Sequence, residues 1–378
     1  MAASADQRLE STGARQDAET VGLIYVDAAQ PGFARRRAGR GFAYRGLDQK
    51  PVRDVAILKR VRDLAVPPAW SSVWICASPL GHIQAIGYDA KGRKQYCYHP
   101  GFRDVRDGAK FEHLLTVAHA LPILRERVAS DMAKRGLARE KVLATVVHLL
   151  ETTMIRIGNS AYARAYDSYG LTTLTTRHIK IEGAELKFRF KGKSGKVWRL
   201  DVQDRRVANI VRQCQELPGQ TLFQYLDENG GAQAVTSADV NGYLKRVSGH
   251  DISAKDFRTW TATVLAGFAL AALEPCAPPQ RARAVSRVVR WVAARLGNTP
   301  TVCRQCYTHP AVIEAYLNGT LRVGITAPEA LEIDHELGEL GRLSAAEGAV
   351  LNFLEAASAV HDAGAVSQRV RDAAAPER

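Results

Sequence analysis

Acidic residues are scarce in this 378-residue sequence relative to basic ones. The chain has 39 Asp and Glu against 52 Lys and Arg, which gives a formal net charge of +13. From Leu321 onward there are five Arg and ten acidic residues, so the first 320 residues carry a net charge of +18. A basic body of this size attracts polyanions, and nucleic acid first among them. The alternative is a basic protein whose charge serves only its solubility.

Long apolar runs, a secretion signal and a set of paired cysteines are also missing. No run reaches the roughly 18 apolar residues that a membrane-spanning helix needs, and the N-terminus lacks the apolar region of a signal peptide. Six cysteines are spread thinly over the chain. That distribution is not a disulfide framework, and it predicts reduced thiols in a cytoplasmic protein with no membrane partner.

The order of patterns along the chain predicts an α+β fold, with a small β-sheet-rich N-terminal domain and a larger, mainly α-helical domain. Alternating segments between turn residues predict strands in the first third, including Val21–Asp27. From about Lys110 onward, apolar residues recur at helical spacing. We expect four parts: a disordered arm (1–20), a β-rich domain (21–105), a helical domain (106–327) and an acidic helical tail packed on the helical domain (328–378).

A β-hairpin with a basic tip is predicted inside the helical domain. Leu186, Phe188 and Phe190 alternate with basic residues, and Gly192–Gly195 leads into a second strand. The Gly-Lys-Ser of this tip does not form a nucleotide-binding loop. Position 187, where that motif needs its first glycine, is a lysine, and the turn joins two strands rather than a strand and a helix. No nucleotide is therefore expected.

Two helix ends can be read directly from the sequence. Ser253 with Asp256 three residues later is a capping box at the start of a helix. Gly297 follows an arginine-rich amphipathic segment and is expected to end that helix.

The segment just after Gly297 contains Cys303, Cys306 and His309 around Tyr307. A structural zinc site needs four ligands, and the sequence has no second pair of closely spaced cysteines. A thioredoxin-like redox pair would follow a strand, whereas this pair follows a basic helical segment. The third candidate is a reactive tyrosine, because a phenol with a pKa near 10 becomes a nucleophile when fixed cations favour its anion.

A tyrosine that attacks a DNA phosphodiester needs further groups around it. Arginines would have to donate hydrogen bonds to the phosphate oxygens. An acid would have to protonate the departing sugar oxygen. A lone Arg or Lys would otherwise be an ordinary surface cation.

Four segments resemble the signature segments of type IB DNA topoisomerases, a family that shares its catalytic fold with tyrosine recombinases. The bacterial and poxvirus branch is the most similar, also through "PPAWSSVWIC" and "GRKQYCYHP" in the N-terminal domain. The four segments are Arg156–Ile179, Phe190–Lys196, Lys255–Trp260 and Leu296–Tyr307. The resemblance implies relaxation of positive and negative supercoils through transient single-strand cleavage, a 3′-phosphotyrosyl intermediate, strand rotation and religation. It further implies no metal, nucleotide or other cofactor, and a nucleoid-associated monomer that clamps duplex DNA.

The resemblance also assigns residues by position. Tyr307 matches the nucleophile, and Arg156 and Arg258 match the arginines that hold the phosphate oxygens. Lys193 matches the lysine that protonates the 5′-hydroxyl leaving group. Asn298 stands where poxvirus and eukaryotic members have a histidine. Because an amide donates hydrogen bonds but exchanges no proton near pH 7, the expected role of Asn298 is oxyanion binding.

Five further positions match family contacts with DNA. The alternative for the basic strand region is a solvated face of a sheet, and the alternative for Tyr98 is packing against the helical domain. These positions are Arg93, Gln95, Tyr96, Tyr98 and Tyr162.

Two other functions remain open from the sequence. A tyrosine recombinase or integrase has the same order of catalytic residues, but usually has H-x-x-R where this chain has Lys-Asp-Phe-Arg ending at Arg258. A non-enzymatic basic DNA-binding protein would bind DNA in a salt-sensitive way and form no covalent adduct.

Overall fold

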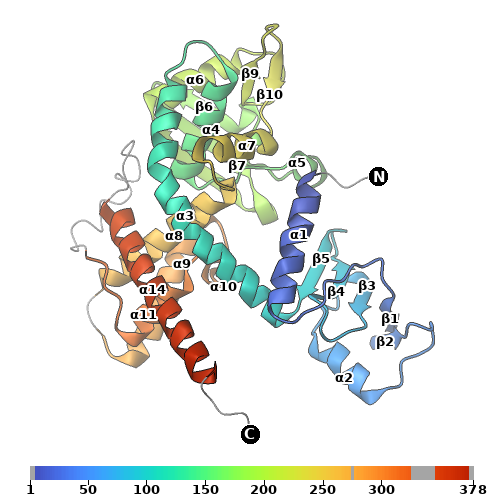
Figure 1. Cartoon of the computed structure of the whole chain (residues 1–378). Coiled ribbons are helices and arrows are strands. Elements are labelled where there is room, and N and C mark those ends of the chain that lie inside the picture. Colours follow the sequence, from blue (N-terminus) through green and yellow to red (C-terminus); the bar gives the residue numbers. More distant parts are fainter. Residues whose placement is uncertain (1–4, 274–275, 325–344, 374–378) are drawn as a thin grey trace. The chain divides into compact units, whose positions relative to one another are not determined.

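The computed structural model describes residues 5–273, 276–324 and 345–373 (Figure 1). The chain divides into two compact units, Met1–Phe111 and Glu112–Arg378. Both the division and the expected boundary after residue 105 lie within one long helix, α3 (Pro100–Met132). Helices and small sheets occur together, which confirms the α+β class. Within the ranges given, no helix combines the length and apolar character needed to span a membrane.

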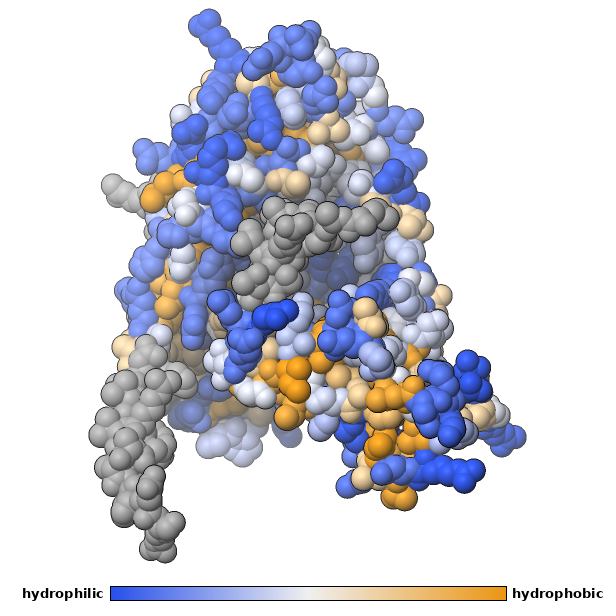
Figure 2. All heavy atoms as spheres, turned by 45° about the vertical axis from the view of Figure 1, so that its right-hand side comes forward, coloured by the Kyte–Doolittle hydropathy of each residue, from blue (hydrophilic) through white to orange (hydrophobic). Residues whose placement is uncertain are grey.

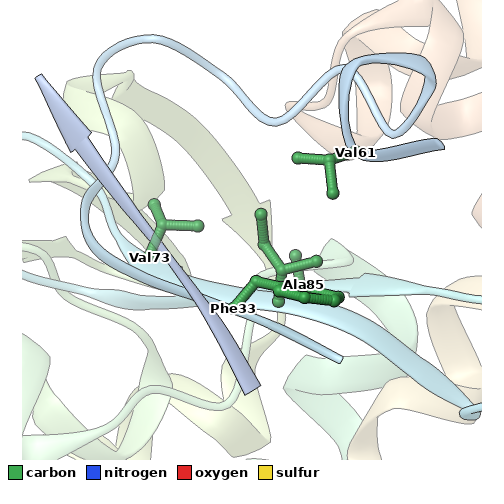
Figure 3. Packing of buried hydrophobic residues seen from close by; sticks show 5 residues of the cluster. Phe33, Val61, Val73 and Ala85 are labelled. Carbon is green, nitrogen blue, oxygen red and sulfur yellow. The ribbon is translucent and has the colours of Figure 1, made fainter. Parts of the chain in front are cut away.

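The first unit is built on a five-stranded antiparallel sheet with the order β2-β1-β3-β4-β5. Helix α2 (Val55–Asp63) packs on this sheet through Val61, which meets Phe33, Val73, Ile75 and Ala85 in the core (Figure 3). The strands are β1 (Gly32–Ala38), β2 (Gly41–Arg45), β3 (Ser71–Cys76), β4 (Ile83–Tyr88) and β5 (Lys94–Tyr98). The β-rich character expected for this region is confirmed.

Two expectations for the N-terminus are wrong. Ala5–Thr20 forms helix α1 rather than a disordered arm, because Ala18 is fully buried against Leu23 and Phe102. The apolar face of this helix is formed by two alanines one turn apart, Ala14 and Ala18. A search of the sequence for periodic large apolar residues does not detect such a face. The segment Val21–Asp27 forms no strand, only a single bridge from Ile24 to Gly81.

Most of the second unit is helical. After α3 come α4 (Arg139–Thr153), α5 (Ser160–Tyr166), α6 (Arg205–Gln215), α7 (Ser237–Ser248), α8 (Ala254–Ala271), α9 (Pro278–Leu296), α10 (Pro300–Cys306), α11 (Pro310–Asn318) and α14 (Ala345–Ala373). Two small antiparallel sheets are β6-β7-β8 and β9-β10. Their strands are β6 (Ile179–Glu182), β7 (Glu185–Lys191), β8 (Val197–Gln203), β9 (Gln224–Leu226) and β10 (Ala232–Ala234).

Helix α8 lies in the centre of the second unit and is buried on nearly all sides. It starts at the predicted capping box, where the Ser253 amide and hydroxyl both donate to the Asp256 carboxylate at 2.9 and 2.8 Å. Helix α9 packs against it and ends at Gly297, as predicted. The face of the molecule in Figure 2 is mostly hydrophilic. The buried residues of α8 place its apolar groups in the interior, where the helix can hold polar side chains rigidly.

The predicted hairpin is confirmed as β7 and β8, with β6 as a third strand. Leu186, Phe188 and Phe190 are buried on one face, and the tip is a short 3₁₀ turn, Lys193–Gly195. Ser194 and Gly195 have positive φ angles of 63° and 78°, so the backbone turns sharply there.

Helix α14 belongs to the core of the second unit, although it comes from the acidic tail. Ala346, Val350 and Leu354 are buried, and the helix contacts α8 and α11. Glu347 is 1% exposed and accepts two hydrogen bonds of 2.8 Å from Arg125 of α3. The part of the predicted tail from 328 to 344, and residues 374–378, lie outside the described residues.

We expect Glu347→Ala to lower the free energy of unfolding by about 3–5 kcal/mol, because it leaves the buried Arg125 guanidinium without one of its two carboxylates. The substitution also removes the acceptor of Trp260 Nε1, at 2.8 Å. Urea unfolding followed by tryptophan fluorescence measures the change. Glu355→Ala is the matched control on the same helix, since its pair with His119 is exposed, and a loss above about 1 kcal/mol there would contradict the interpretation.

Candidate active site

Arg258 extends from the buried helix α8 and joins the ends of two other helices. Arg258 is only 3% exposed. Its Nη1 donates to the carbonyl of Met154 at the end of α4. Its Nη2 donates to the carbonyl of Leu296 at the end of α9, at 2.7 Å. The last carbonyls of a helix have no partner within the helix and carry its negative dipole end. Arg258 therefore stabilises both helix ends and also sets their spacing.

Arg156 lies just after the end of α4, where the chain turns sharply. Met154 has a left-handed φ of 57°, which ends the helix, and the chain then places Arg156 beside the end of α9. Its Nη2 donates to Oδ1 of Asn298. Its own carbonyl accepts from Leu171 N at 2.9 Å, and a side chain on Gly170 would collide with it. The backbone of Arg156 is thus held on a second side by the loop before β6.

Asn298 lies directly after Gly297, whose φ of +64° ends α9. The backbone N–H of Asn298 donates to the Ala293 carbonyl at 2.9 Å, which fixes the backbone. Because its side-chain oxygen accepts from Arg156, the Nδ2 amino group points elsewhere. Within the described part of the chain, Nδ2 is buried and has no hydrogen-bond partner, and the same is true of Arg258 Nε.

Tyr307 caps the C-terminal end of α10, with Arg258 Cζ 5.4 Å from the centre of its ring. Burial by itself raises the pKa of the Tyr307 phenol, but the charges of Arg258, Arg156 and, more weakly, Lys193 lower it, and the net pKa lies below the ordinary value for tyrosine. Burial and the charge of Arg156 in turn lower the pKa of Arg258 to about 10. The arrangement favours a phenolate among cations.

Thr263, one and a half turns after Arg258 on α8, holds the backbone around the tyrosine. Its hydroxyl donates to the Tyr307 carbonyl at 3.3 Å and accepts from the His309 amide at 3.1 Å. Thr263 is fully buried. Sequence reasoning missed this residue, because a threonine in an apolar helix has no signal of its own.

Lys193 lies exposed at the tip of the β7–β8 hairpin. Its charge contributes to the lowered pKa of Tyr307, so the hairpin tip is within electrostatic range of the phenol. The structure therefore brings together two arginines, an amide donor and a phenol, four of the five residues predicted for catalysis, and the lysine acts on the phenol through its charge. Such a set can bind an anion, attack it and protonate a leaving group.

The phenol is expected to titrate earlier than an ordinary tyrosine. In an ultraviolet difference titration the Tyr307 phenol should ionise below the ordinary pH for tyrosine, and this component should be missing in Tyr307→Phe. In Arg156→Gln the midpoint should move to higher pH, since a charge that favours the phenolate is lost. An unchanged midpoint would show that Arg156 does not act on the phenol.

The cysteines of the segment have separate surroundings. Cys303 is buried, with Thr308 Oγ1 3.9 Å from its sulfur, and burial raises the pKa of its thiol. Cys306 is exposed. None of the six cysteines forms a disulfide, and no group of three or more potential metal ligands is found among the described residues.

The positions predicted to contact DNA lie on two elements. On β5, Tyr96 and Tyr98 share the exposed face and stack with ring centres 5.8 Å apart, while Gln95 is on the opposite face. Arg93 and Gln95 both donate to the carboxylate of Asp89, at 2.7 and 3.1 Å. Tyr162 is 47% exposed on α5, a helix without buried residues.

Comparisons with known proteins match the chain over both units. Residues 99–322 match the family model of the eukaryotic DNA topoisomerase I catalytic core, and residues 41–89 match that of the bacterial DNA topoisomerase IB N-terminal domain. The DNA topoisomerase 1B of Acanthamoeba polyphaga mimivirus is 28% identical over 76% of this chain and 88% of its own length. The enzyme of the same name from vaccinia virus is 24% identical over 62% of this chain and 73% of its own length.

These matches do not favour the alternative of a tyrosine recombinase. They confirm the branch that the sequence resembles, since one model describes a bacterial N-terminal domain and the relatives are viral. With more than half of the chain matched to the catalytic core, the protein belongs to the type IB DNA topoisomerase family.

Proposed function

We propose that Tyr307 cuts one strand of duplex DNA, that the cut strand turns about the intact one, and that the reverse reaction reseals it. One observation carries the proposal: the Tyr307 ring lies beside Arg258, and the charges of Arg258 and Arg156 lower the pKa of the phenol. The phenol oxygen attacks phosphorus and forms a 3′-phosphotyrosyl link, and a 5′-hydroxyl leaves. The link preserves the energy of the broken bond, so supercoils of either sign relax without ATP.

Arg156, Arg258 and Asn298 would hold the non-bridging phosphate oxygens. The support is that Asn298 Nδ2 and Arg258 Nε are buried donors with no partner among the described residues. An unpaired buried donor costs free energy, and an anion that enters the site would remove that cost. Fixed donors of this kind stabilise the charge that develops in the transition state.

Lys193 would donate a proton to the departing 5′-oxygen. The phenol proton passes to water before or during attack, and the lysine regains its proton from water, so no net proton is consumed. The support is the electrostatic effect of Lys193 on the phenol. An exposed hairpin tip can also move toward the leaving group when DNA binds.

The substrate is DNA, and we propose that residues of each unit contact it. Tyr96 and Tyr98 form an exposed stacked pair on β5. Tyr162 is exposed on α5, the helix that follows Arg156 in the sequence. All five catalytic residues come from one chain, which supports a monomer. The Gly-Lys-Ser turn joins β7 to β8, which supports a reaction without nucleotide. The DNA substrate supports a nucleoid location in the cytoplasm.

A trapping experiment tests the proposal. The protein is incubated with supercoiled plasmid in EDTA without ATP, and one portion is stopped with detergent. We expect relaxed plasmid in the untreated portion and, in the stopped portion, protein joined to the 3′ end of a nicked strand. Relaxation that depends on an added metal or nucleotide, or an adduct at the 5′ end, would refute the proposal. Salt-sensitive binding without any adduct would indicate a non-enzymatic DNA-binding protein.

A further inference from the structure

The indole of Trp198 lies against two glycines that each precede a proposed catalytic residue. Trp198 is on β8, directly after the tip of the hairpin, and is half-buried. A Cβ atom added to Gly192 would lie 2.7 Å from Cδ1 and Nε1 of this indole. A Cβ atom added to Gly297 would lie 2.8 Å from its Cζ2. The absence of side chains at both positions lets the indole approach both backbones.

These two contacts join segments that are far apart in the sequence. Gly192 is followed by Lys193, and Gly297 is followed by Asn298. The first pair is at the tip of the hairpin and the second is at the corner between α9 and α10. One indole therefore contacts both the backbone before Lys193 and the backbone before Asn298.

The indole itself is held by its own sheet. Trp198 pairs with Phe190 across β7 and β8, and the two rings are parallel within 1° at 6.1 Å between centres. Phe190 is 4% exposed and belongs to the core. On the other side of the hairpin, Lys191 accepts from Tyr169 N at 2.8 Å through its carbonyl and pairs with Asp167 at 3.6 Å. The strand ends next to the tip are thus anchored, whereas the tip residues around Lys193 are exposed.

We propose that Trp198 is a positioning residue that docks the hairpin against the α9–α10 corner and so places Lys193 at the leaving group. The proposal rests on the proposed role of Lys193 as general acid. In that step the bond between the Tyr307 oxygen and phosphorus forms while the bond from phosphorus to the 5′-oxygen breaks. The Lys193 ammonium gives one proton to the 5′-oxygen, which leaves as a hydroxyl. Trp198 touches neither DNA nor the proton in this scheme.

Leaving-group chemistry separates positioning from general support of the fold. In a duplex whose scissile 5′-oxygen is replaced by sulfur, the leaving group is a thiolate, which departs without a proton because thiols are much more acidic than alcohols. A variant that only misplaces the acid should cleave this sulfur-linked duplex normally. A variant with a damaged site around Tyr307 or Asn298 should cleave both duplexes slowly.

The experiment measures single-turnover cleavage of the oxygen-linked and sulfur-linked duplexes with saturating enzyme. For Trp198→Ala we expect cleavage of the oxygen-linked duplex to slow about tenfold or more, which is part of the about 10²–10⁴-fold that general-acid catalysis contributes. Cleavage of the sulfur-linked duplex should stay within about twofold of wild type. Trp198→Phe should restore most of the loss because it keeps an aromatic ring against the glycines. In Lys193→Ala, adding Trp198→Ala should cause little further loss, since both act on one proton transfer.

Val197→Ala is the matched control, because neighbouring side chains on a strand point to opposite faces and Val197 is exposed. It should leave both rates unchanged. Equal slowing of both duplexes by Trp198→Ala, or no slowing of either, would overturn the positioning role. Wild-type protein that forms no adduct with either duplex would instead refute the proposed function, so the two failures can be told apart.

Discussion

Tyr307→Phe is expected to abolish both the covalent adduct and supercoil relaxation while duplex binding is retained. The substitution removes one oxygen atom, and this oxygen belongs to the phenol on which the charges of Arg258 and Arg156 act. The ring can keep its position over Arg258, so the fold should not change. Detergent trapping on end-labelled duplex measures the adduct, and gel mobility measures binding. We expect the adduct to fall below detection.

The control for this substitution is Tyr316→Phe on α11, in the same unit. Its hydroxyl contacts the sulfur of Cys276 at 3.6 Å and no residue proposed for catalysis. Relaxation by this variant should stay within about twofold of wild type. An adduct that persists in Tyr307→Phe at the wild-type level would show that another residue is the nucleophile, and peptide mapping of the adduct would identify it.

Arg258→Ala is expected to slow cleavage by about 10²-fold or more, because one fixed donor to the developing oxyanion is lost. Two further effects act in the same direction. The phenol loses the cation that most lowers its pKa, and the Met154 and Leu296 carbonyls lose their donor. Single-turnover cleavage with saturating enzyme, corrected for the folded fraction from circular dichroism, measures the chemical step.

Arg258→Lys distinguishes the charge from the geometry of the guanidinium. A lysine keeps the positive charge but not the planar fork that reaches two carbonyls and a phosphate oxygen. We expect a cleavage rate between those of Arg258→Ala and wild type. Arg246→Ala, an exposed arginine on α7, controls for loss of one positive charge and should stay within about twofold. Wild-type cleavage by Arg258→Ala would exclude the arginine from the site.

Much of the local structure was predictable because it depends on neighbouring residues. The alternation of Leu186, Phe188 and Phe190 with basic residues predicted the hairpin, and the structure buries these three side chains on one face. Ser253 with Asp256 predicted the start of α8, and Gly297 predicted the end of α9. Each of these signals acts within a few residues, through hydrogen bonds to the backbone or through side-chain periodicity.

The errors occurred where stability comes from contacts with distant segments. Helix α1 was not predicted, because its alanine face is stable only against Leu23 and Phe102. Glu347 looked like one more charge of an acidic tail, yet it is buried against Arg125. The contacts of Trp198 with Gly192 and Gly297 could not be predicted, because they join segments that only packing brings together.

The sequence by itself determined the kinds of group present and, through the resemblance, the family. Only the tertiary structure decided how these groups meet. Arg156 and Asn298 are 142 positions apart and form a hydrogen bond because α4 and α9 end side by side, with Arg258 donating to the last carbonyls of both. The low pKa of Tyr307 has the same origin, since a phenol becomes acidic only where folding concentrates positive charge.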